Sequence, residues 1–251
     1  MSRVLLITGT SGIAAATARL ATTRGDRVFV IGNSEEQGQA LSSELNNSAY
    51  CHADVSDEDA IHHAIATCIN KFGAIDAVFN VAGLSGRSLG DGPLHQCSTS
   101  AWQTLMDVHA TGTFFVCREA IRHWLAADRP GIVLNTSSVL AHFPEREHFA
   151  TVAYASSKGA IESMTLSVAA YYAYYKIRLN VLAPGLVKTP MSARAQSDPT
   201  ILEFMKHKQP LKGNFVEADE LARVAYFLLS EESYPMTGEI IRADAGWAVT
   251  G

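Results

Sequence analysis

The 251-residue chain is 47 % apolar, which is enough to bury one large α/β core without a second domain. Its net charge of −5 provides no positive field for nucleic acid or an anionic membrane, so we expect neither partner and favour a small-molecule substrate. Four cysteines without C-x-x-C spacing, Cys51, Cys68, Cys97 and Cys117, indicate reduced thiols in a cytoplasmic protein. The first apolar run has only the length of a strand, so we expect no secretion signal or membrane span.

Short apolar runs alternate with helical patterns along the chain. In order, we predict a strand over 4–7, a helix over 12–24, a strand over 27–31, a helix over 35–45, a strand over 49–52, a helix over 57–72, a strand over 76–80, a helix over 101–125, a strand over 131–136, a helix over 152–175, and strands over 177–182 and 239–242. Such alternation is typical of βαβ units with right-handed crossovers. We therefore expect an α/β, Rossmann-type, doubly wound parallel sheet of about seven strands, in one domain over 1–251.

Three long irregular segments interrupt this pattern, at 84–100, 140–151 and 185–212. Ligands of open parallel sheets bind beyond the carboxyl ends of the strands, so these segments are the expected functional loops. The last segment carries helical pieces and has the length of an active-site lid.

A glycine-containing turn lies between the first strand and the first helix. Bare glycines there let the backbone approach a pyrophosphate at the helix N-terminus, although a tight turn also favours glycine for structural reasons alone. The predicted dinucleotide contacts in this turn are Gly9, Thr10, Ser11, Gly12 and Ile13. Asp54-Val55 after the third strand is a second signal, because a carboxylate can accept from the adenine amino group. The alternative role for Asp54 is helix capping, for which Asp57 competes.

Tyr154 and Lys158 are four residues apart in a predicted helix, so they share one face. A nearby ammonium favours the phenolate and moves the pKa of the tyrosine toward the working range of an acid or base. Ser138, upstream, can hydrogen-bond the same substrate oxygen. In isolation this Tyr-Lys spacing more often marks an ordinary surface pair, and it is the accompanying motifs that favour a catalytic role.

Taken together, these motifs resemble the short-chain dehydrogenase/reductase family along nearly the whole chain. The family pattern T-G-x-x-x-G-x-G, D-V, N-x-A-G, S, Y-x-x-x-K and P-G-x-x-x-T is represented in order by Thr8-Gly9, Asp54-Val55, Asn80 to Gly83, Ser138, Tyr154 with Lys158, and Pro184 to Thr189. The resemblance implies reversible hydride transfer between NAD or NADP and a secondary alcohol or ketone.

The resemblance also implies the role of each matching residue. Tyr154 would exchange the hydroxyl proton, Ser138 would hold the substrate oxygen, and Lys158 would bind the ribose hydroxyls and lower the pKa of the tyrosine. Further cofactor contacts are implied for Asn80, Ala82, Gly83, Pro184, Gly185, Val187 and Thr189.

Three features depart from the family pattern. The glycine turn is one residue shorter, with Ala14 at the place of the last glycine; read as Gly9, Gly12 and Ala15, it has the spacing of the extended branch of the family. His109 stands where the family usually has an asparagine that supports a water chain from the lysine. We expect His109 to take over this catalytic relay, with a histidine satisfied within the core as the alternative.

The third departure is a longer connection between Ser138 and Tyr154, in which the added stretch is 141–149. His142 and His148 in this stretch have no third ligand at a suitable spacing, so we expect no metal site. We expect the stretch to form a polar wall of the substrate pocket instead.

The cofactor preference depends on the end of the second strand. Gly32 and Asn33 provide neither the carboxylate typical of NAD binding nor the basic side chain typical of NADP binding. Asn33 and Ser34 can donate to a 2′-phosphate, whereas Glu35 and Glu36 oppose it, so both cofactors remain open.

The tyrosines near the end of the catalytic helix, Tyr171, Tyr172, Tyr174 and Tyr175, can pack inward or against a partner subunit. In the resembling family this helix and the preceding long one form a bundle between subunits, which implies a homodimer or homotetramer.

Polar residues near the expected pocket, Arg87, His142, Arg146 and His148, favour a sugar-derived, polyol or small polar keto substrate. A 3-oxoacyl thioester reductase is the alternative enzyme, although the glycine turn lacks the basic residue that usually binds its NADPH. A dinucleotide-sensing protein without turnover is the alternative from another class, and a structural role comes third.

Overall fold

Seven parallel strands form the central sheet of the computed structural model, which describes residues 2–250. The strands lie in the order β3-β2-β1-β4-β5-β6-β9, so the chain winds outward in both directions from the boundary between β1 and β4. Their bounds are Val4–Thr8 (β1), Arg27–Gly32 (β2), Ser48–His52 (β3), Ala77–Asn80 (β4), Gly131–Thr136 (β5), Ile177–Pro184 (β6) and Ile240–Ala243 (β9). This confirms the predicted doubly wound Rossmann-type sheet.

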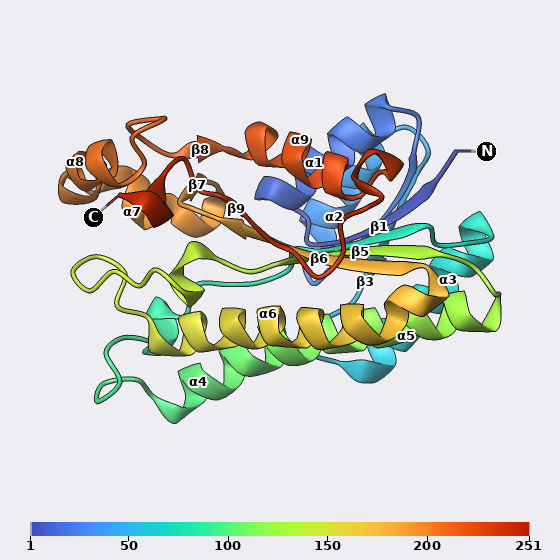
Figure 1. Ribbon diagram of the computed structural model, residues 1–251, viewed down its shortest axis with the longest axis horizontal. Helices are drawn as coiled ribbons and strands as arrows, with labels where there is room; N and C mark the ends of the chain where they lie inside the picture. Colours follow the sequence, from blue (N-terminus) through green and yellow to red (C-terminus); the bar gives the residue numbers. More distant parts are fainter. Residues whose placement is uncertain (1, 251) are drawn as a thin grey trace.

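Helices cover both faces of the sheet (Figure 1). One face is covered by α1 (Gly12–Thr23), α2 (Glu35–Glu44) and α9 (Ala218–Leu228), and the other by α3 (Glu58–Phe72), α4 (Thr99–Leu105), α5 (Gly112–Ala126) and α6 (Val152–Tyr172). Every residue of β1, β5 and β6 is buried, as expected for central parallel strands between two helical layers. The apolar run is therefore continuous in β1, whereas β6 also buries the polar side chains of Arg178 and Asn180.

The predicted helix over 101–125 is interrupted in the structure. A π-helical turn, Met106–Thr111, separates α4 from α5 and contains His109. Close packing follows directly after the turn, because a Cβ atom on Gly112 would lie 2.9 Å from the Cγ2 atom of Val55. Such turns change the direction of side chains within a continuous helix and are frequent at functional sites.

The segment predicted as a lid contains structure that we did not predict. Two-residue strands, β7 (Val187–Lys188) and β8 (Val216–Glu217), pair with each other and enclose α7 (Ala193–Ser197) and α8 (Pro199–Lys208). Buried Gln209 joins their ends, because its side chain accepts from the Leu186 amide and donates to the Leu186 and Asn214 carbonyls. The whole segment lies beyond the carboxyl ends of the main strands (Figure 1).

Within residues 2–250, no helix combines the length and apolar character needed to cross a membrane.

Candidate active site

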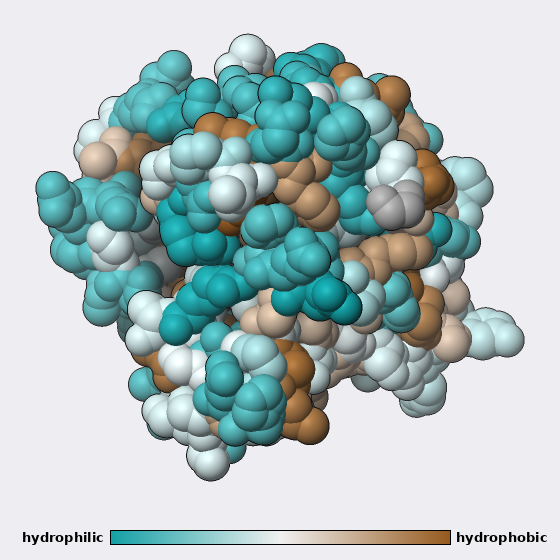
Figure 2. All heavy atoms as spheres, turned by 90° about the vertical axis from the view of Figure 1, so that its left-hand side faces the viewer, coloured by the Kyte–Doolittle hydropathy of each residue, from teal (hydrophilic) through white to brown (hydrophobic). Residues whose placement is uncertain are grey.

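A cavity of about 740 Å³ opens at the carboxyl ends of the strands. Figure 2 views the molecule from the side of α7 and α8, where hydrophilic side chains dominate the surface and apolar ones lie between them. Most predicted site residues line this cavity: Gly9, Thr10, Ser11, Gly12, Ile13, Asn33, Ser34, Asp54, Val55, Ala82, Gly83, Ser138, Tyr154, Lys158, Pro184, Gly185, Val187 and Thr189. Asn80 and His109 are not among the lining residues.

The glycine turn has the backbone geometry of a ligand cradle. Gly9 and Gly12 have φ values of +104° and +54°, which side chains disfavour, and a Cβ atom on Gly12 would lie 2.8 Å from the Cγ2 atom of Thr189. Ser11 at the N-cap of α1 makes no side-chain capping bond, so the first amide groups of α1 are available to an anion. The turn therefore fits a pyrophosphate despite its shorter length.

Thr8 couples this turn to the segment after β4. Its hydroxyl accepts hydrogen bonds from the amides of Val81 and Ala82, at 3.0 and 3.1 Å. The two segments that would flank a dinucleotide are thus held together by one side chain.

The adenine end of the cavity holds Asn33, Ser34 and Asp54. Asp57, and not Asp54, caps α3, because the Asp57 carboxylate accepts from the Ala60 amide at 3.0 Å. The capping alternative for Asp54 is therefore wrong, and its carboxylate instead accepts from the amide and hydroxyl of Ser56. Ser34 caps α2 through the Gln37 amide. The part of the lining contributed by β2 and β3 contains no basic side chain, so cofactor preference stays open.

Tyr154 is positioned by a residue that the sequence analysis missed. The buried carboxylate of Asp91 accepts hydrogen bonds from the amides of Ala153 and Tyr154, at 2.9 and 3.0 Å. It thereby caps the first turn of α6 from a loop more than sixty residues earlier in the chain. Only an isolated Asp between Gly90 and Gly92 marks this role in the sequence, and such a pattern is also typical of an ordinary turn.

Lys158 is 4 % exposed and donates to the carbonyl oxygen of Thr136 at 3.0 Å. This bond uses one of the three N–H donors of the ammonium, and the other two fit a pair of ribose hydroxyls. Burial lowers the pKa of Lys158 to about 8, because no carboxylate offsets the loss of hydration. The ammonium lies 5.7 Å from the centre of the Tyr154 ring.

The pKa of Tyr154 corrects the expectation from spacing. Burial raises it above its ordinary value, while the hydroxyl of Ser138, within hydrogen-bonding reach, acts in the opposite direction. Burial is the largest cause of the shift, and the ammonium of Lys158, 5.7 Å from the ring centre, does not offset it. In the protein alone, Tyr154 is therefore a neutral proton donor.

His109 lies beneath the cavity, fully buried. Its Nε2 atom accepts from the Leu84 amide at 3.0 Å, so Nδ1 carries the proton and donates to the Ser157 hydroxyl, 2.8 Å away. That hydroxyl donates in turn to the Tyr154 carbonyl. Burial and the charge of Lys158 both lower the pKa of His109, which keeps the ring neutral. Both nitrogens are thus used within the protein, as in the alternative of a satisfied core histidine, and the relay role stays a prediction.

Asn80 also lies behind the cavity wall. Its Nδ2 atom donates to the Oδ1 atom of Asn135 at 2.9 Å, and Asn135 donates to the Thr165 hydroxyl. The segment after β4 reaches the cavity through Val81, Ala82 and Gly83 instead. The Asn80 side chain thus lies outside the cavity lining, and the cofactor contact that the resemblance implied for Asn80 stays a prediction.

The stretch 141–149 does not form the expected polar wall. His142 contacts buried Glu162 outside the cavity. The ring centre of His148 lies 5.0 Å from that of Phe204. The side chain of Arg146 is 91 % exposed and does not line the cavity. The wall is instead mostly apolar, with Leu140, Phe149 and Trp247, together with Arg87 and the unpredicted Arg194.

Comparisons with known proteins agree with this geometry. A family model described as enoyl-(acyl carrier protein) reductase matches residues 7–248. The chain is 31 % identical over 250 residues to cis-4-hydroxycyclohexanecarboxylate dehydrogenase of Sinomonas cyclohexanicum, covering 98 % of this chain and 96 % of that protein. It is 34 % identical over 258 residues to 2-(R)-hydroxypropyl-CoM dehydrogenase of Xanthobacter autotrophicus, covering 98 % and 99 %. It is also similar to the crystal structure of levodione reductase, with a TM-score of 0.89, 28 % identity, and coverage of 98 % and 97 %.

Proposed function

The chain belongs to the short-chain dehydrogenase/reductase family, and we propose that this oxidoreductase transfers a hydride between NAD or NADP and a secondary alcohol or ketone at the cavity of Ser138, Tyr154 and Lys158. The observation that supports this proposal is the convergence of these three side chains on one cavity with the glycine turn. When bound, the nicotinamide supplies or takes up the hydride.

Each of the three side chains has one task. The hydroxyl of Ser138 holds the substrate oxygen, and the phenol of Tyr154 gives that oxygen a proton in reduction or takes the proton in oxidation. Lys158 binds the ribose hydroxyls with its free donors and keeps a positive charge near the phenol. Asp91 and His109 hold the first turns of α6, and hence Tyr154, in place.

The substrate we propose is a small polar hydroxy or keto compound. Two relatives named above act, by their names, on small hydroxylated compounds, which supports this size class. Leu140, Phe149 and Trp247 line the same cavity as Ser138 and Tyr154.

The function is tested by two measurements on the purified protein. The first is a titration with NADH and NADPH, followed by nicotinamide fluorescence at one salt concentration; a tenfold difference, about 1.4 kcal/mol, identifies the preferred cofactor. The second is a screen of small secondary alcohols and ketones, with a short 3-oxoacyl thioester included as the alternative substrate. Binding without any turnover would favour the dinucleotide-sensing alternative, and no binding would favour a structural role.

We also propose that the protein is a homodimer or homotetramer through the outer face of α4, α5 and α6. These helices, and the turn that follows α6, expose large apolar side chains: Trp102, Phe114, Leu166, Tyr171 and Tyr175, each at least 39 % exposed. A bundle of these helices with their copies would bury them.

Leu166→Glu is expected to halve the mass of the assembly or reduce it to one chain, because a carboxylate in an apolar helix interface is costly. Light scattering after size exclusion measures this mass. Leu94→Glu, on a loop residue with 75 % exposure, is the matched control and should leave the mass unchanged. A wild-type mass of one chain, or an unchanged mass in Leu166→Glu, would contradict the proposed interface.

The proposed location is the cytoplasm, where thiols stay reduced. All four cysteines are unpaired, and burial raises the pKa of Cys68 and Cys117 to about 12, so these two are inert as nucleophiles.

A further inference from the structure

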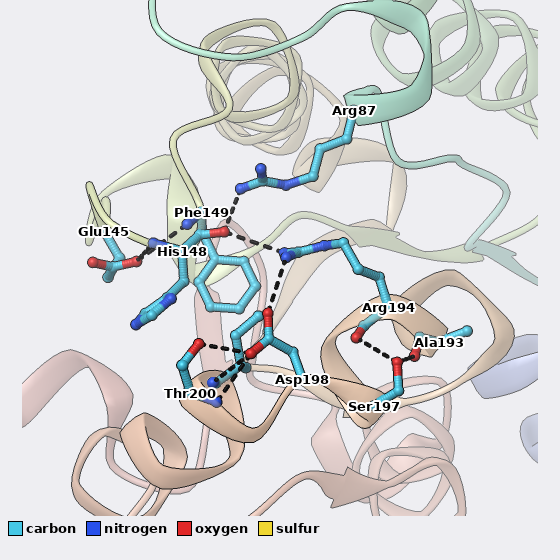
Figure 3. A network of polar contacts seen from close by, with 10 residues as sticks. Arg87, Glu145, His148, Phe149, Ala193, Arg194, Ser197, Asp198 and Thr200 are labelled. Atoms are coloured by element: carbon cyan, nitrogen blue, oxygen red, sulfur yellow. Dashed lines mark hydrogen bonds and ion pairs between the residues drawn. The ribbon is translucent and has the colours of Figure 1, made fainter.

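Two arginines from distant parts of the chain meet at the substrate side of the cavity (Figure 3). Arg87 belongs to the short 3-10 turn Arg87–Leu89 after β4, and Arg194 belongs to α7 in the lid segment. Both guanidinium groups donate to one acceptor, the carbonyl oxygen of His148; the Arg194 Nη2 atom is 3.2 Å from it. Figure 3 shows Arg87 reaching this oxygen from above and Arg194 reaching it from the right.

The positive charges of this pair are poorly neutralised. Asp198 is the one carboxylate within 4.0 Å of either guanidinium among residues 2–250, at 3.9 Å from the Nη1 atom of Arg194. The Oδ2 atom of Asp198 faces Arg194, while its Oδ1 atom caps α8, where it accepts from the Thr200 and Ile201 amides. A shared carbonyl has a dipole but no net charge, so two like charges face each other across a neutral group.

Nearby acidic groups do not change this balance. Asp91 is occupied by the first amides of α6, and Glu145 accepts from the amides of Glu147, His148 and Phe149. The pKa of Arg87 is lowered from its ordinary value, chiefly by burial and next by the charge of Arg194, which outweigh Asp91 and Glu145. An anion between the two guanidiniums would relieve this repulsion.

The pair lies away from the residues predicted to contact the adenosine and pyrophosphate of a dinucleotide. The glycine turn, Asn33 and Asp54 follow β1, β2 and β3, whereas Arg87, His148 and Arg194 follow β4, β5 and β7. The ring of Phe149 lies next to both Arg194 and Trp247. The centre of the Phe149 ring is 6.0 Å from the Arg194 guanidinium and 5.7 Å from the Trp247 ring centre. Arg87 and Arg194 line the same cavity as Ser138 and Tyr154. The pair is therefore placed to contact a substrate rather than the phosphates of a dinucleotide.

We propose that Arg87 and Arg194 bind an oxyanion, such as a carboxylate, at the end of the substrate remote from the reacting hydroxyl or carbonyl. The inference rests on the proposed function and narrows its substrate class from polar to anionic compounds. Guanidinium groups bind carboxylates through two parallel hydrogen bonds, and Arg87 uses one of its five N–H donors within the described chain. The His148 carbonyl holds the two forks in position while the remaining donors bind the anion.

Binding of matched acids and amides tests the proposal. Levulinate and the next two longer methyl-ketone acids, each paired with its neutral primary amide, are titrated by calorimetry into protein saturated with the oxidised cofactor, so that no ketone is reduced. At least one acid should bind about tenfold or more tightly than its amide. Arg87→Gln and Arg194→Gln should each reduce this preference, and the double variant should abolish it. Arg146→Gln removes a positive charge from an exposed position in the loop that carries His148. This variant should retain the preference for the acid.

The outcomes separate this inference from the proposed function. Equal binding of acid and amide to the wild type, or absence of acid binding, overturns the anion site. Loss of acid and amide binding to the same extent in the arginine variants also overturns it, because the arginines would then only fix the loop. Addition of the same ketones to protein with reduced cofactor gives the second readout: an acid preference without any nicotinamide oxidation would leave the anion site standing and overturn the proposed hydride transfer.

Discussion

Tyr154→Phe is expected to lower kcat by about 10²–10⁴-fold, which is the usual contribution of a positioned general acid or base. The substitution removes the phenol oxygen and keeps the ring, which packs edge-on against the His109 ring with centres 5.4 Å apart. The affinity for the reduced cofactor should remain largely unchanged, because Lys158 and the glycine turn are untouched. Steady-state kinetics and the fluorescence titration measure the two quantities separately.

Tyr171→Phe is the matched control for this experiment. Tyr171 lies on the same helix with 64 % exposure, so its hydroxyl is far from any buried network and its loss should change neither quantity. If Tyr154→Phe retains most of its activity, the proton is exchanged by another group. A loss of cofactor binding together with turnover would instead indicate that the phenol has a structural role.

The arrangement of Tyr154 and Lys158 was predictable because it depends on helical spacing alone. The alternation of strands and helices was predictable for the same reason, since central parallel strands are continuous apolar runs. Both signals lie within a few consecutive residues.

Contacts between distant segments left no such signal. Asp91 caps α6 across sixty residues, and Arg194 reaches the cavity only because the lid segment folds over the carboxyl ends of the strands. The strands β7 and β8 have two residues each, too short for any periodic pattern. Polar residues of the stretch 141–149 were assigned to the cavity from their position in the sequence, yet His142 contacts buried Glu162 outside the cavity lining.

The pKa of Tyr154 differs from expectation for another physical reason. Spacing in the sequence shows that a positive charge is near, but it does not show how completely the phenol loses its hydration. Burial dominates in the structure, and it acts on Lys158 as well, where it opposes the charged form. The charged form of Lys158 consequently lowers the stability of the fold, although the active site requires it.

Lys158→Met is therefore expected to stabilise the protein without cofactor while it abolishes turnover. Burial lowers the pKa of Lys158 from 10.5 to about 8, which corresponds to a cost of about 3 kcal/mol while the group is charged. Methionine keeps the apolar stem but loses the hydrogen bond to the Thr136 carbonyl, a loss of about 1 kcal/mol. The free energy of unfolding near pH 7 should thus rise by about 2 kcal/mol, as measured by urea denaturation at one protein concentration.

The pH dependence distinguishes this cause from better packing. Between pH 8 and pH 10.5 the unfolded lysine binds more protons than the folded one, so the stability of the wild type rises with pH relative to the variant. The advantage of Lys158→Met should shrink by about 2 kcal/mol between about pH 7 and about pH 9.5. Lys176→Met, which changes an exposed lysine just beyond the same helix, should stay within about 0.5 kcal/mol of the wild type at both values. If the gain in unfolding free energy of Lys158→Met were independent of pH, the buried charge of Lys158 would not be its cause.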